Sequence, residues 1–450
     1  MPDDRSLDAI FKAYDVRGVV PDEFDAGLAR RIGAAAARVF EGEAIVVGRD
    51  VRPTSQELVS AFAEGVISEG VDVVHVGLSS TDMLYFSSGL LDVPGAMFTG
   101  SHNPAQYNGI KLCRAGAVPV SIDSGLGEIR DLVASDELSS SGSRGAEREE
   151  DMLSRYAEHV RSFIDLDVLR PLTVVIDAAN GMAGHVVPAV FEPLPFELVP
   201  LYFELDGTFP NHPPDPSNNE NLADLRTSVR EHEADLGLAF DGDADRIFVV
   251  NEHGEPVRPS LIAAVVAARV LEKEPGATIL YNLICSRIVP ETVREHGGEP
   301  IRTRVGHSFI KERMAETGAA YGAEHSGHYY FRENYRADSG LVAALILLEA
   351  VSLADAPLSE VLAPYDRYVQ SGEVNFEVDD QEAVLERVED EFRGRGELDR
   401  TDGLTVELEV AWFNLRPSNT EPVIRLNVEA DEEDEMARLR DEVAELVRGG

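Results

Sequence analysis

Several residue types are scarce in this chain, and each scarcity excludes a class of protein. The 450 residues include two cysteines, Cys113 and Cys285, so a disulfide framework is excluded and a reducing, cytoplasmic location is expected. The apolar run over residues 341–348 is far shorter than the roughly 20 residues that span a bilayer. We expect no secretory signal, because no basic and then apolar segment opens the chain. With 44% apolar residues, the chain can still bury several cores.

Positive charge is also scarce, and lysine is the scarcest basic residue. The chain has 40 basic and 82 acidic residues and a net charge of −42, so neither nucleic acid nor an anionic membrane is an expected partner. Of the basic residues, 36 are arginine and four are lysine: Lys12, Lys111, Lys273 and Lys311. This composition is typical of salt-adapted, haloarchaeal-like proteins, and a merely acidic mesophilic protein is the alternative. We expect the lysines near motifs to have local roles and Lys273 to be incidental.

Strand–helix–strand units recur three times along the chain. They span residues 44–76, 172–199 and 278–301, and in each a short apolar run is followed by a helical pattern and a second apolar run. Recurrence at similar spacing predicts three related α/β domains. In the first unit, Thr54 and Glu57 predict a capping box at the start of the helix.

The C-terminal part of the chain has a different pattern, typical of a smaller α+β domain. It predicts strands over 373–378, 404–410 and 423–428 and helices over 380–393 and 431–447. A Ser/Gly-rich segment over 138–150 is expected to be a loop or edge segment. The predicted domains are residues 1–150, 151–253, 254–369 and 370–450.

The strongest local motif is FDGDADR, residues 240–246, between two apolar strand-like runs. Asp241, Asp243 and Asp245 alternate, so their carboxylates project to one side of an extended turn. Three such close carboxylates repel one another unless a cation lies between them, and Mg²⁺ prefers oxygen ligands. A solvated acidic turn is the alternative. A calcium-binding EF-hand is disfavoured by Arg246 where that loop needs glycine, whereas a haloacid-dehalogenase-type phosphatase with Asp241 as nucleophile stays open.

Two further loops carry groups that suit a ligand. The segment RPSNTEP, residues 416–422, offers donors for a phosphate group, although an ordinary Ser/Asn/Pro turn looks similar. The segment GAEHSGH, residues 322–328, offers Glu324 and Ser326 to the hydroxyls of a polyol. No Walker loop and no dinucleotide-binding glycine motif occurs, so we expect no nucleotide cofactor.

Together and in this order, the motifs resemble those of the α-D-phosphohexomutase family over essentially the whole chain. The matching segments are FKAYDVRG (11–18), TGSHNP (99–104), NGIK (108–111), DGDADR (241–246), residues 323–328 and RPSNTEP (416–422). The resemblance implies four domains around a central cleft, each giving one loop. It also implies reversible phosphoryl transfer between the 1- and 6-positions of a hexose phosphate, through a phosphoserine and a hexose 1,6-bisphosphate that serves as intermediate and activator.

The resemblance further implies a role for each matching residue. The catalytic set is Ser101, His102, Lys111, Arg17 and Arg246, in which Ser101 carries the phosphoryl group. His102 and Lys111 would transfer protons, or Lys111 would orient the phosphoryl group. One Mg²⁺ per chain would be held by Asp241, Asp243, Asp245 and the phosphate on Ser101. The substrate-binding set is Tyr14, His307, Glu324, Ser326, His328, Arg416, Ser418, Asn419 and Thr420.

Substrate preference within the family is less sharply indicated. Asn419 and the segment ending in His328 favour the phosphomannomutase/phosphoglucomutase group over the phosphoglucosamine mutases. Residues 283–285 read Leu-Ile-Cys where bifunctional members often have a lysine. Outside the enzyme class, the alternative is a non-catalytic phosphosugar-binding protein. The expected partner is a phosphosugar, with the chain a monomer or weak homo-oligomer.

Overall fold

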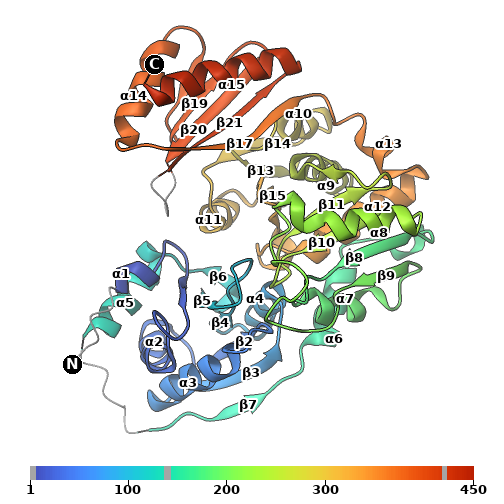
Figure 1. The fold of residues 1–450 in the computed structure, drawn as a ribbon. Helices are drawn as coiled ribbons and strands as arrows, with labels where there is room; N and C mark the ends of the chain where they lie inside the picture. The colour runs from blue at the N-terminus through green and yellow to red at the C-terminus, as the bar shows by residue number, and fades with distance from the viewer. Residues whose placement is uncertain (1–6, 136–142, 418–422, 450) are drawn as a thin grey trace.

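Four β-sheets follow one another along the chain (Figure 1). The computed structural model describes residues 7–135, 143–417 and 423–449. Helices cover the first three sheets, which contain parallel strands, whereas the fourth sheet is antiparallel. In Figure 1 the N-terminal and C-terminal sheets lie at opposite ends of the molecule, with the other two between them. The predicted fold class, three α/β units and a smaller α+β unit, is therefore confirmed.

The first sheet has the strand order β1–β5–β4–β2–β3–β7, with β6 beside β5. Its strands are β1 (Val16–Val19), β2 (Ala44–Arg49), β3 (Asp72–Leu78), β4 (Gly95–Phe98), β5 (Tyr107–Arg114), β6 (Val118–Pro119) and β7 (Glu147–Glu149). Its helices are α1 (Leu7–Ile10), α2 (Ala26–Val39), α3 (Ser55–Ser68), α4 (Thr81–Leu91) and α5 (Gly127–Ala134). Successive residues of β2 face opposite sides: Val47 packs with α2, α3 and α5, and Val46 packs with α4.

The second and third sheets have the orders β12–β11–β10–β8–β9 and β14–β13–β15–β16. Their strands are β8 (Thr173–Asp177), β9 (Glu197–Leu201), β10 (Leu236–Phe240), β11 (Ile247–Asn251), β12 (Pro256–Val257), β13 (Thr278–Asn282), β14 (Glu299–Thr303), β15 (Tyr321–Ala323) and β16 (Tyr329–Phe331). Their helices are α6 (Leu153–Arg161), α7 (Ala183–Phe191), α8 (Ala223–Glu231), α9 (Pro259–Lys273), α10 (Ile288–Glu295), α11 (His307–Thr317), α12 (Gly340–Ala354) and α13 (Leu358–Leu362). None of the helices in the described part of the chain is long and apolar enough to cross a membrane.

The fourth sheet has the order β17–β21–β20–β19–β18. Its elements are β17 (Val369–Glu377), α14 (Gln381–Phe392), β18 (Glu397–Asp399), β19 (Leu404–Glu407), β20 (Ala411–Pro417), β21 (Val423–Ala430) and α15 (Glu433–Arg448). Both helices pack their apolar sides against the sheet, as Val388 and Val443 share a cluster with Phe413.

The same turn recurs in the first three sheets, and it positions the predicted site loops. A strand that is parallel to one neighbour ends and turns back as an antiparallel neighbour on its other side. The turns join β4 to β5, β10 to β11 and β15 to β16, and they contain residues 99–106, 241–246 and 324–328. In the fourth sheet, Arg416 and Pro417 of the predicted phosphate loop end β20, which pairs antiparallel with β21, and residues 418–422 lie outside the described part of the chain.

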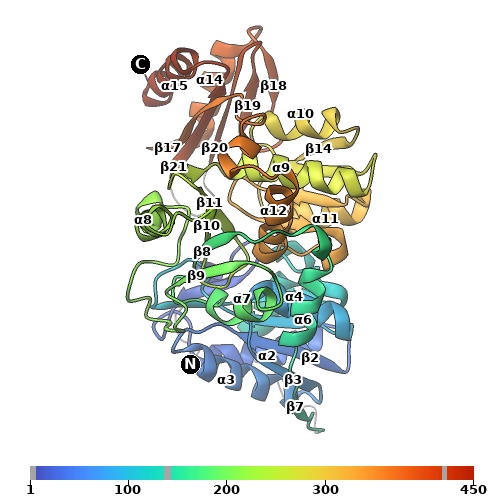
Figure 2. The same cartoon turned by 90° about the vertical axis from the view of Figure 1, so that its right-hand side faces the viewer.

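One apolar core runs through the first three sheets. It includes Met97 of β4, Ile176 of β8 and Ile279 of β13, together with Phe86 of α4 and Leu345 of α12. Figure 2 shows α4, α6 and α7 gathered where the first two sheets meet. The fourth sheet and its two helices have a core of their own. Burial of apolar surface therefore joins the first three units, and among the described residues no apolar cluster is shared with the fourth.

The capping box predicted at Thr54 is wrong. Helix α3 begins at Ser55, and the Thr54 side chain makes no capping hydrogen bond. The Thr54 hydroxyl oxygen instead accepts a hydrogen bond of 2.9 Å from Asn108 Nδ2. The Ser55 hydroxyl donates at 2.6 Å to Asp50 Oδ1. Asn108, 54 residues away, thus binds the Thr54 hydroxyl that a local cap would have used.

Candidate active site

Ser101 lies in the turn between β4 and β5, where it is 5% exposed. Its φ of 49° is in the left-handed region, which serine seldom adopts. The backbone N–H donates at 2.8 Å to Thr99 Oγ1. The side-chain Oγ lies 3.0 Å from Asp241 Oδ2 and 3.3 Å from His102 Nδ1. The hydroxyl is therefore held where the first two hairpin turns meet.

The three aspartates of the second turn are gathered as the sequence predicts. Asp241, Asp243 and Asp245 are each at most 1% exposed, and ligand atoms of all three lie within 4.8 Å of one another. Asp243 Oδ1 and Asp245 Oδ1 are buried without a hydrogen-bond partner among the described residues. Buried carboxylate oxygens left unpaired are costly, and an all-oxygen set suits a hard divalent cation. The residues present therefore fit a Mg²⁺ ion.

Glycine at position 242 lets this acidic turn approach the serine turn. A Cβ atom at Gly242 would lie 2.5 Å from the carbonyl oxygen of Ser101. Any side chain there would push the two hairpins apart. The second glycine-dependent approach concerns Gly100, where a Cβ atom would lie 2.6 Å from Cζ of Arg52.

The three aspartates differ in how their surroundings shift their pKa values. Burial raises the pKa of Asp241 well above its usual range, and the Arg246 guanidinium offsets only part of this. Burial, together with the negative charge of Asp243, also raises the pKa of Asp245. Burial acts on Asp243 in the same direction, but the Lys111 ammonium outweighs it and holds the pKa of Asp243 well below its usual range.

Lys111 of β5 reaches across from the first sheet to this cluster. Its Nζ lies 2.7 Å from Asp243 Oδ2 and 2.6 Å from Asp245 Oδ2, and its side chain is 13% exposed. Burial alone would lower the pKa of Lys111, but the two carboxylates raise it well above its usual range. These two ion pairs hold the Lys111 ammonium against the acidic turn.

Two arginines border the serine turn, and each has a buried nitrogen without a hydrogen-bond partner among the described residues, Nε of Arg17 and Nη2 of Arg246. Arg246 Nε lies 2.9 Å from Asp241 Oδ2, and its buried Nη2 has no hydrogen-bond partner among the described residues. Arg17 donates from Nη1 at 2.6 Å to Asn103 Oδ1 and pairs through Nη2 with Asp15 Oδ2 at 2.5 Å. Arg246 Nη2 is therefore free to donate to an anionic ligand at the serine.

His102 is neutral at ordinary pH. Burial lowers the pKa of its imidazole to about 2, and the positive charges of Arg246 and Arg17 add to the effect. Its Nδ1, at 3.3 Å from Ser101 Oγ, is close enough to exchange a proton with a hydroxyl bound at that position.

The third turn contributes Glu324, which is 3% exposed. Its Oε2 accepts at 2.6 Å from the Tyr330 hydroxyl. Its Oε1 accepts at 3.0 Å from the backbone N–H of Gly306 and at 3.3 Å from Asn282 Nδ2. These bonds fix the carboxylate in one orientation.

Ser326 and His328 lie on the same turn and connect it to the acidic turn. Ser326 Oγ and His328 Nδ1 are 2.8 Å apart, and His328 Nε2 is 3.9 Å from Asp245 Oδ1. A backbone bridge also pairs His328 with Arg246. The second and third turns are therefore in direct contact.

Tyr14 and His307 form a contact between the first and third units. Tyr14 precedes β1, His307 begins α11, and their rings are 4.9 Å apart in an edge-to-face arrangement. Burial lowers the pKa of His307 well below its usual range, and the nearby Lys311 adds to this. The imidazole is thus a neutral hydrogen-bonding group.

Arg416 of β20 is 8% exposed and belongs to the fourth unit. Its Nη2 lies 3.5 Å from Glu373 Oε2, and its buried Nε has no hydrogen-bond partner in the described part of the chain. Its neighbours Ser418, Asn419 and Thr420, which the sequence assigns to the same phosphate loop, lie outside the described residues. Arg416 therefore has one donor, its Nε, that could bind an anionic group.

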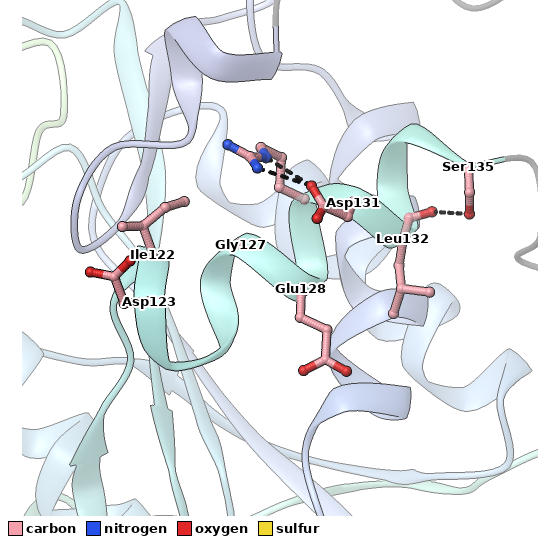
Figure 3. A pocket seen from close by; sticks show the side chains of 8 residues that line it. Ile122, Asp123, Gly127, Glu128, Asp131, Leu132 and Ser135 are labelled. Atoms are coloured by element: carbon pink, nitrogen blue, oxygen red, sulfur yellow. Dashed lines mark hydrogen bonds and ion pairs between the residues drawn. The ribbon is translucent and has the colours of Figure 1, made fainter.

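The surface hollow drawn in Figure 3 is not this site. It has a volume of about 590 Å³ and lies beside α5, and none of the residues that line it is a predicted site residue. Its lining includes Asp123, Glu128 and Asp131, and Asp131 pairs with Arg130 at 3.0 Å. An acidic lining of this kind disfavours an anionic sugar phosphate.

Sequence reasoning missed residues that support the acidic turn from α4. The Thr81 hydroxyl donates at 2.6 Å to Asp243 Oδ2, and the Thr81 N–H donates at 3.0 Å to the Asp243 carbonyl. The adjacent Asp82 is fully buried and accepts from Tyr156 at 2.5 Å and from Ser339 at 2.6 Å. The available signal was the polar run SSTD, residues 79–82, directly after a predicted strand.

Comparisons with known proteins agree over the whole chain. Four models described as phosphoglucomutase/phosphomannomutase, namely alpha/beta/alpha domains I, II and III and the C-terminal domain, match residues 8–139, 154–254, 258–368 and 373–446.

Individual relatives are similar along their full length. The chain is 41% identical over 443 residues to a protein named "Phosphohexose mutases" from Xanthomonas campestris, covering 98% of this chain and 99% of that one. It is 37% identical over 440 residues to a "Phosphomannomutase/phosphoglucomutase" from Pseudomonas aeruginosa, covering 96% and 94%. A crystal structure of a phosphoglucomutase/phosphomannomutase family protein from Burkholderia thailandensis superposes with a TM-score of 0.90 at 36% identity, covering 99% of both chains.

Proposed function

The chain belongs to the phosphoglucomutase/phosphomannomutase family and is a hexose phosphate mutase, and from this premise we propose that Ser101 carries the transferred phosphoryl group. The reaction is reversible transfer between the 1- and 6-positions of mannose phosphate, glucose phosphate or both. The observation that carries the proposal is the 3.0 Å contact between Ser101 Oγ and Asp241 Oδ2, which places a strained, buried hydroxyl against an acidic cluster. Strained backbone of this kind is concentrated at functional sites.

Asp241, Asp243 and Asp245 would hold one Mg²⁺ together with a phosphate oxygen on Ser101. The support is the gathering of three buried carboxylates with two unpaired oxygens. When bound, the ion would neutralise these charges and withdraw electron density from the phosphoryl oxygens. Arg246 and Arg17 would balance the remaining charge on the phosphoryl group, and Lys111 would fix the two aspartates that it contacts.

The transfer itself exchanges one P–O bond for another. A sugar hydroxyl attacks the phosphoserine, the bond between phosphorus and Ser101 Oγ breaks, and a bond to the sugar oxygen forms. The hydroxyl proton would pass to His102 or Lys111, the two residues expected to transfer protons, and the departing Ser101 Oγ would take up a proton as its bond to phosphorus breaks. The resulting hexose 1,6-bisphosphate turns over and returns its other phosphoryl group to Ser101.

The remaining predicted residues would bind the sugar in both orientations. Glu324, Ser326, His328, His307 and Tyr14 would hold hydroxyls. Arg416, Ser418, Asn419 and Thr420 would bind whichever phosphate is not reacting. The predicted domain limits after residues 150, 253 and 369 are part of this proposal. So are the phosphomannomutase/phosphoglucomutase preference, a monomeric or weakly associated chain, and salt adaptation.

A single assay compares the candidate functions. Mannose 1-phosphate, glucose 1-phosphate and glucosamine 1-phosphate are supplied separately, each with a trace of glucose 1,6-bisphosphate, at low and at molar KCl. We expect 6-phosphate products from mannose and glucose, with turnover that rises with KCl and stops on chelation of Mg²⁺. Preferred turnover of glucosamine 1-phosphate would reassign the substrate, and release of inorganic phosphate without isomerisation would indicate a phosphatase.

A further inference from the structure

A fully buried arginine lies behind the serine turn. Arg52 follows β2, outside every motif that the sequence analysis used, and its side chain is 0% exposed. Its Nε lies 3.1 Å from Asp50 Oδ2, so the buried cation is paired within its own segment. A buried arginine costs much free energy unless all its donors are satisfied.

Four backbone carbonyl groups of the serine turn satisfy those donors. Arg52 Nη2 donates to the carbonyls of Ser101 at 2.8 Å and Asn103 at 2.6 Å. Arg52 Nη1 donates to the carbonyls of Pro104 at 2.7 Å and Tyr107 at 3.0 Å. With Asp50 on Nε, each of the five guanidinium N–H groups has its own acceptor. The carbonyl groups of the turn thus surround the planar guanidinium group of Arg52.

The space around this guanidinium is closed on its other sides. Gly100 is required there, because a Cβ atom would lie 2.7 Å from Arg52 Nε. Phe209, from a loop of the second sheet, lies with its ring centroid 5.0 Å from Arg52 Cζ. Arg52 therefore touches the serine turn from behind and, through Phe209, the unit that carries the acidic turn.

We propose that Arg52 is a positioning residue for phosphoryl transfer: it holds the left-handed backbone of Ser101 and so aims the Ser101 Oγ at the metal-binding aspartates. This inference rests on the proposed function and deepens it. Arg52 does not touch the reacting atoms; it acts through the carbonyl groups of the turn. The turn requires the planar set of N–H groups of a guanidinium, which lysine cannot reproduce although it keeps the charge.

The test compares Arg52→Lys with Arg49→Lys. Arg49 is the matched control, since it ends β2 in the same sheet and donates from Nη1 at 3.3 Å to the carbonyl of Asp50. Each purified variant is mixed with glucose 1,6-bisphosphate, the rate of phosphate addition to Ser101 is followed by quenched intact-mass spectrometry, and kcat and KM are measured separately. Folding is checked by circular dichroism and thermal unfolding.

For Arg52→Lys we expect the phosphorylation rate and kcat to fall about a hundredfold, because small displacements of a reacting group have effects of that size. KM should stay within about threefold of wild type, since the sugar-binding and phosphate-binding residues are untouched. Arg49→Lys should match wild type. Wild-type rates in folded Arg52→Lys would overturn the inference, as would a loss seen in KM alone.

If Arg52→Lys does not fold, the same measurements on Asp50→Asn decide the question, because that change removes the charge that pairs with Arg52 and leaves the arginine in place. A fall in kcat at constant KM supports the inference, and wild-type kinetics overturn it. Failure of the proposed function is distinguished by the wild-type protein itself, which would then take no phosphate on Ser101.

Discussion

The serine end and the phosphate-binding end of the site are held in different ways. Around Ser101, three turns from three sheets meet over one continuous apolar core, and their charged groups are buried against one another. Arg416 instead belongs to a unit with its own core. That unit contacts the third one through partly exposed ion pairs of Arg302, at 2.8 Å from both Glu407 and Asp399. Hydrogen bonds add to these: the Arg287 backbone N–H donates to Glu429 Oε1 at 2.9 Å, and Arg287 Nη2 donates to the carbonyl of Leu408 at 2.8 Å.

This difference suggests a division of labour. Apolar burial fixes relative positions, whereas partly exposed ion pairs contribute little and are weakened by salt. Phosphoryl transfer needs fixed geometry, which the shared core of the first three units can give to the residues proposed for it. The proposed phosphate site would accept a sugar in two orientations and could tolerate adjustment, which suits a unit outside that core. The predictions below probe the two ends, starting with the largest effect.

Replacing the proposed nucleophile should abolish phosphoryl transfer at the serine end of the site. Ser101→Ala should lower mutase turnover by about a thousandfold or more, equivalent to roughly 4 kcal/mol of barrier, because the covalent carrier is lost. Turnover is measured in a coupled assay for the 6-phosphate product, with Ser121→Ala, at a half-buried serine outside the predicted site, as the control. Retention of a tenth of wild-type turnover would remove Ser101 from the mechanism.

Weakening the metal site should have the next largest effect. Asp243→Asn keeps the shape but removes one charge, so turnover should fall by about a hundredfold and recover partly in excess Mg²⁺. Calorimetric titration of Mn²⁺ should show weaker binding. The exposed Asp167→Asn is the control. Unchanged cation affinity in the Asp243 variant would argue against a metal at these carboxylates.

Replacing Arg416, the arginine proposed to bind phosphate, tests the other end of the site, because the change should act on KM. Arg416→Ala should raise KM by about ten- to a hundredfold with little change in kcat, as one charge-assisted contact contributes about 1.5–3 kcal/mol. Arg425→Ala, on the adjacent strand and facing the same Glu373, is the control. A loss confined to kcat would place Arg416 with the serine end instead.

A substitution at Lys111 tests how closely the acidic turn is packed at the serine end of the site. Lys111→Arg keeps the charge, but a wider group between Asp243 and Asp245 should lower turnover by at least about tenfold, or 1.4 kcal/mol. Lys273→Arg should leave turnover unchanged. Lys273 is not incidental as predicted, however: its Nζ lies 2.9 Å from the fully buried Glu349, so it is a structural counter-charge. Equal turnover of both variants would show that lysine is not required at position 111.

The smallest effect should come from weakening the ion pairs between the third and fourth units. Arg302→Ala removes two ion pairs to that unit and should raise KM by about two- to threefold at low salt, with kcat unchanged. In molar KCl, where wild-type pairs are screened, the difference between variant and wild type should vanish. A persistent difference at high salt would mean that Arg302 acts by packing or by contacting substrate.

Much of the fold follows from periodicity in the sequence. The strand–helix–strand units were recognisable because apolar runs and helical patterns alternate clearly, and β2 and β13 begin at residues 44 and 278, the predicted starts of the first and third units. The elements of the C-terminal unit were predicted less accurately. One strand was predicted over 404–410, and residues 415–422 were read as loop, but the chain turns at 408–410 and β20 runs over Ala411–Pro417. That turn, Leu-Glu-Val, has none of the glycine, proline or asparagine that marks a hairpin.

The site was predictable where side chains of a special kind are close in sequence, as in the three aspartates at positions 241, 243 and 245. It was not predictable where the partner is distant or is backbone. Thr81 and Asp243 are 162 residues apart, and no local pattern connects them. Arg52 binds carbonyl groups, which every residue has, so the sequence of the turn does not reveal its partner.

Locating the phosphate after reaction with glucose 1,6-bisphosphate tests the central claim most directly. The protein is quenched within one turnover, digested, and mapped by tandem mass spectrometry beside Ser101→Ala. We expect one acid-stable phosphate on Ser101 and no phosphate on the variant. An acid-labile acyl phosphate on Asp241, present in both proteins, would contradict the account and assign the nucleophile to the acidic turn.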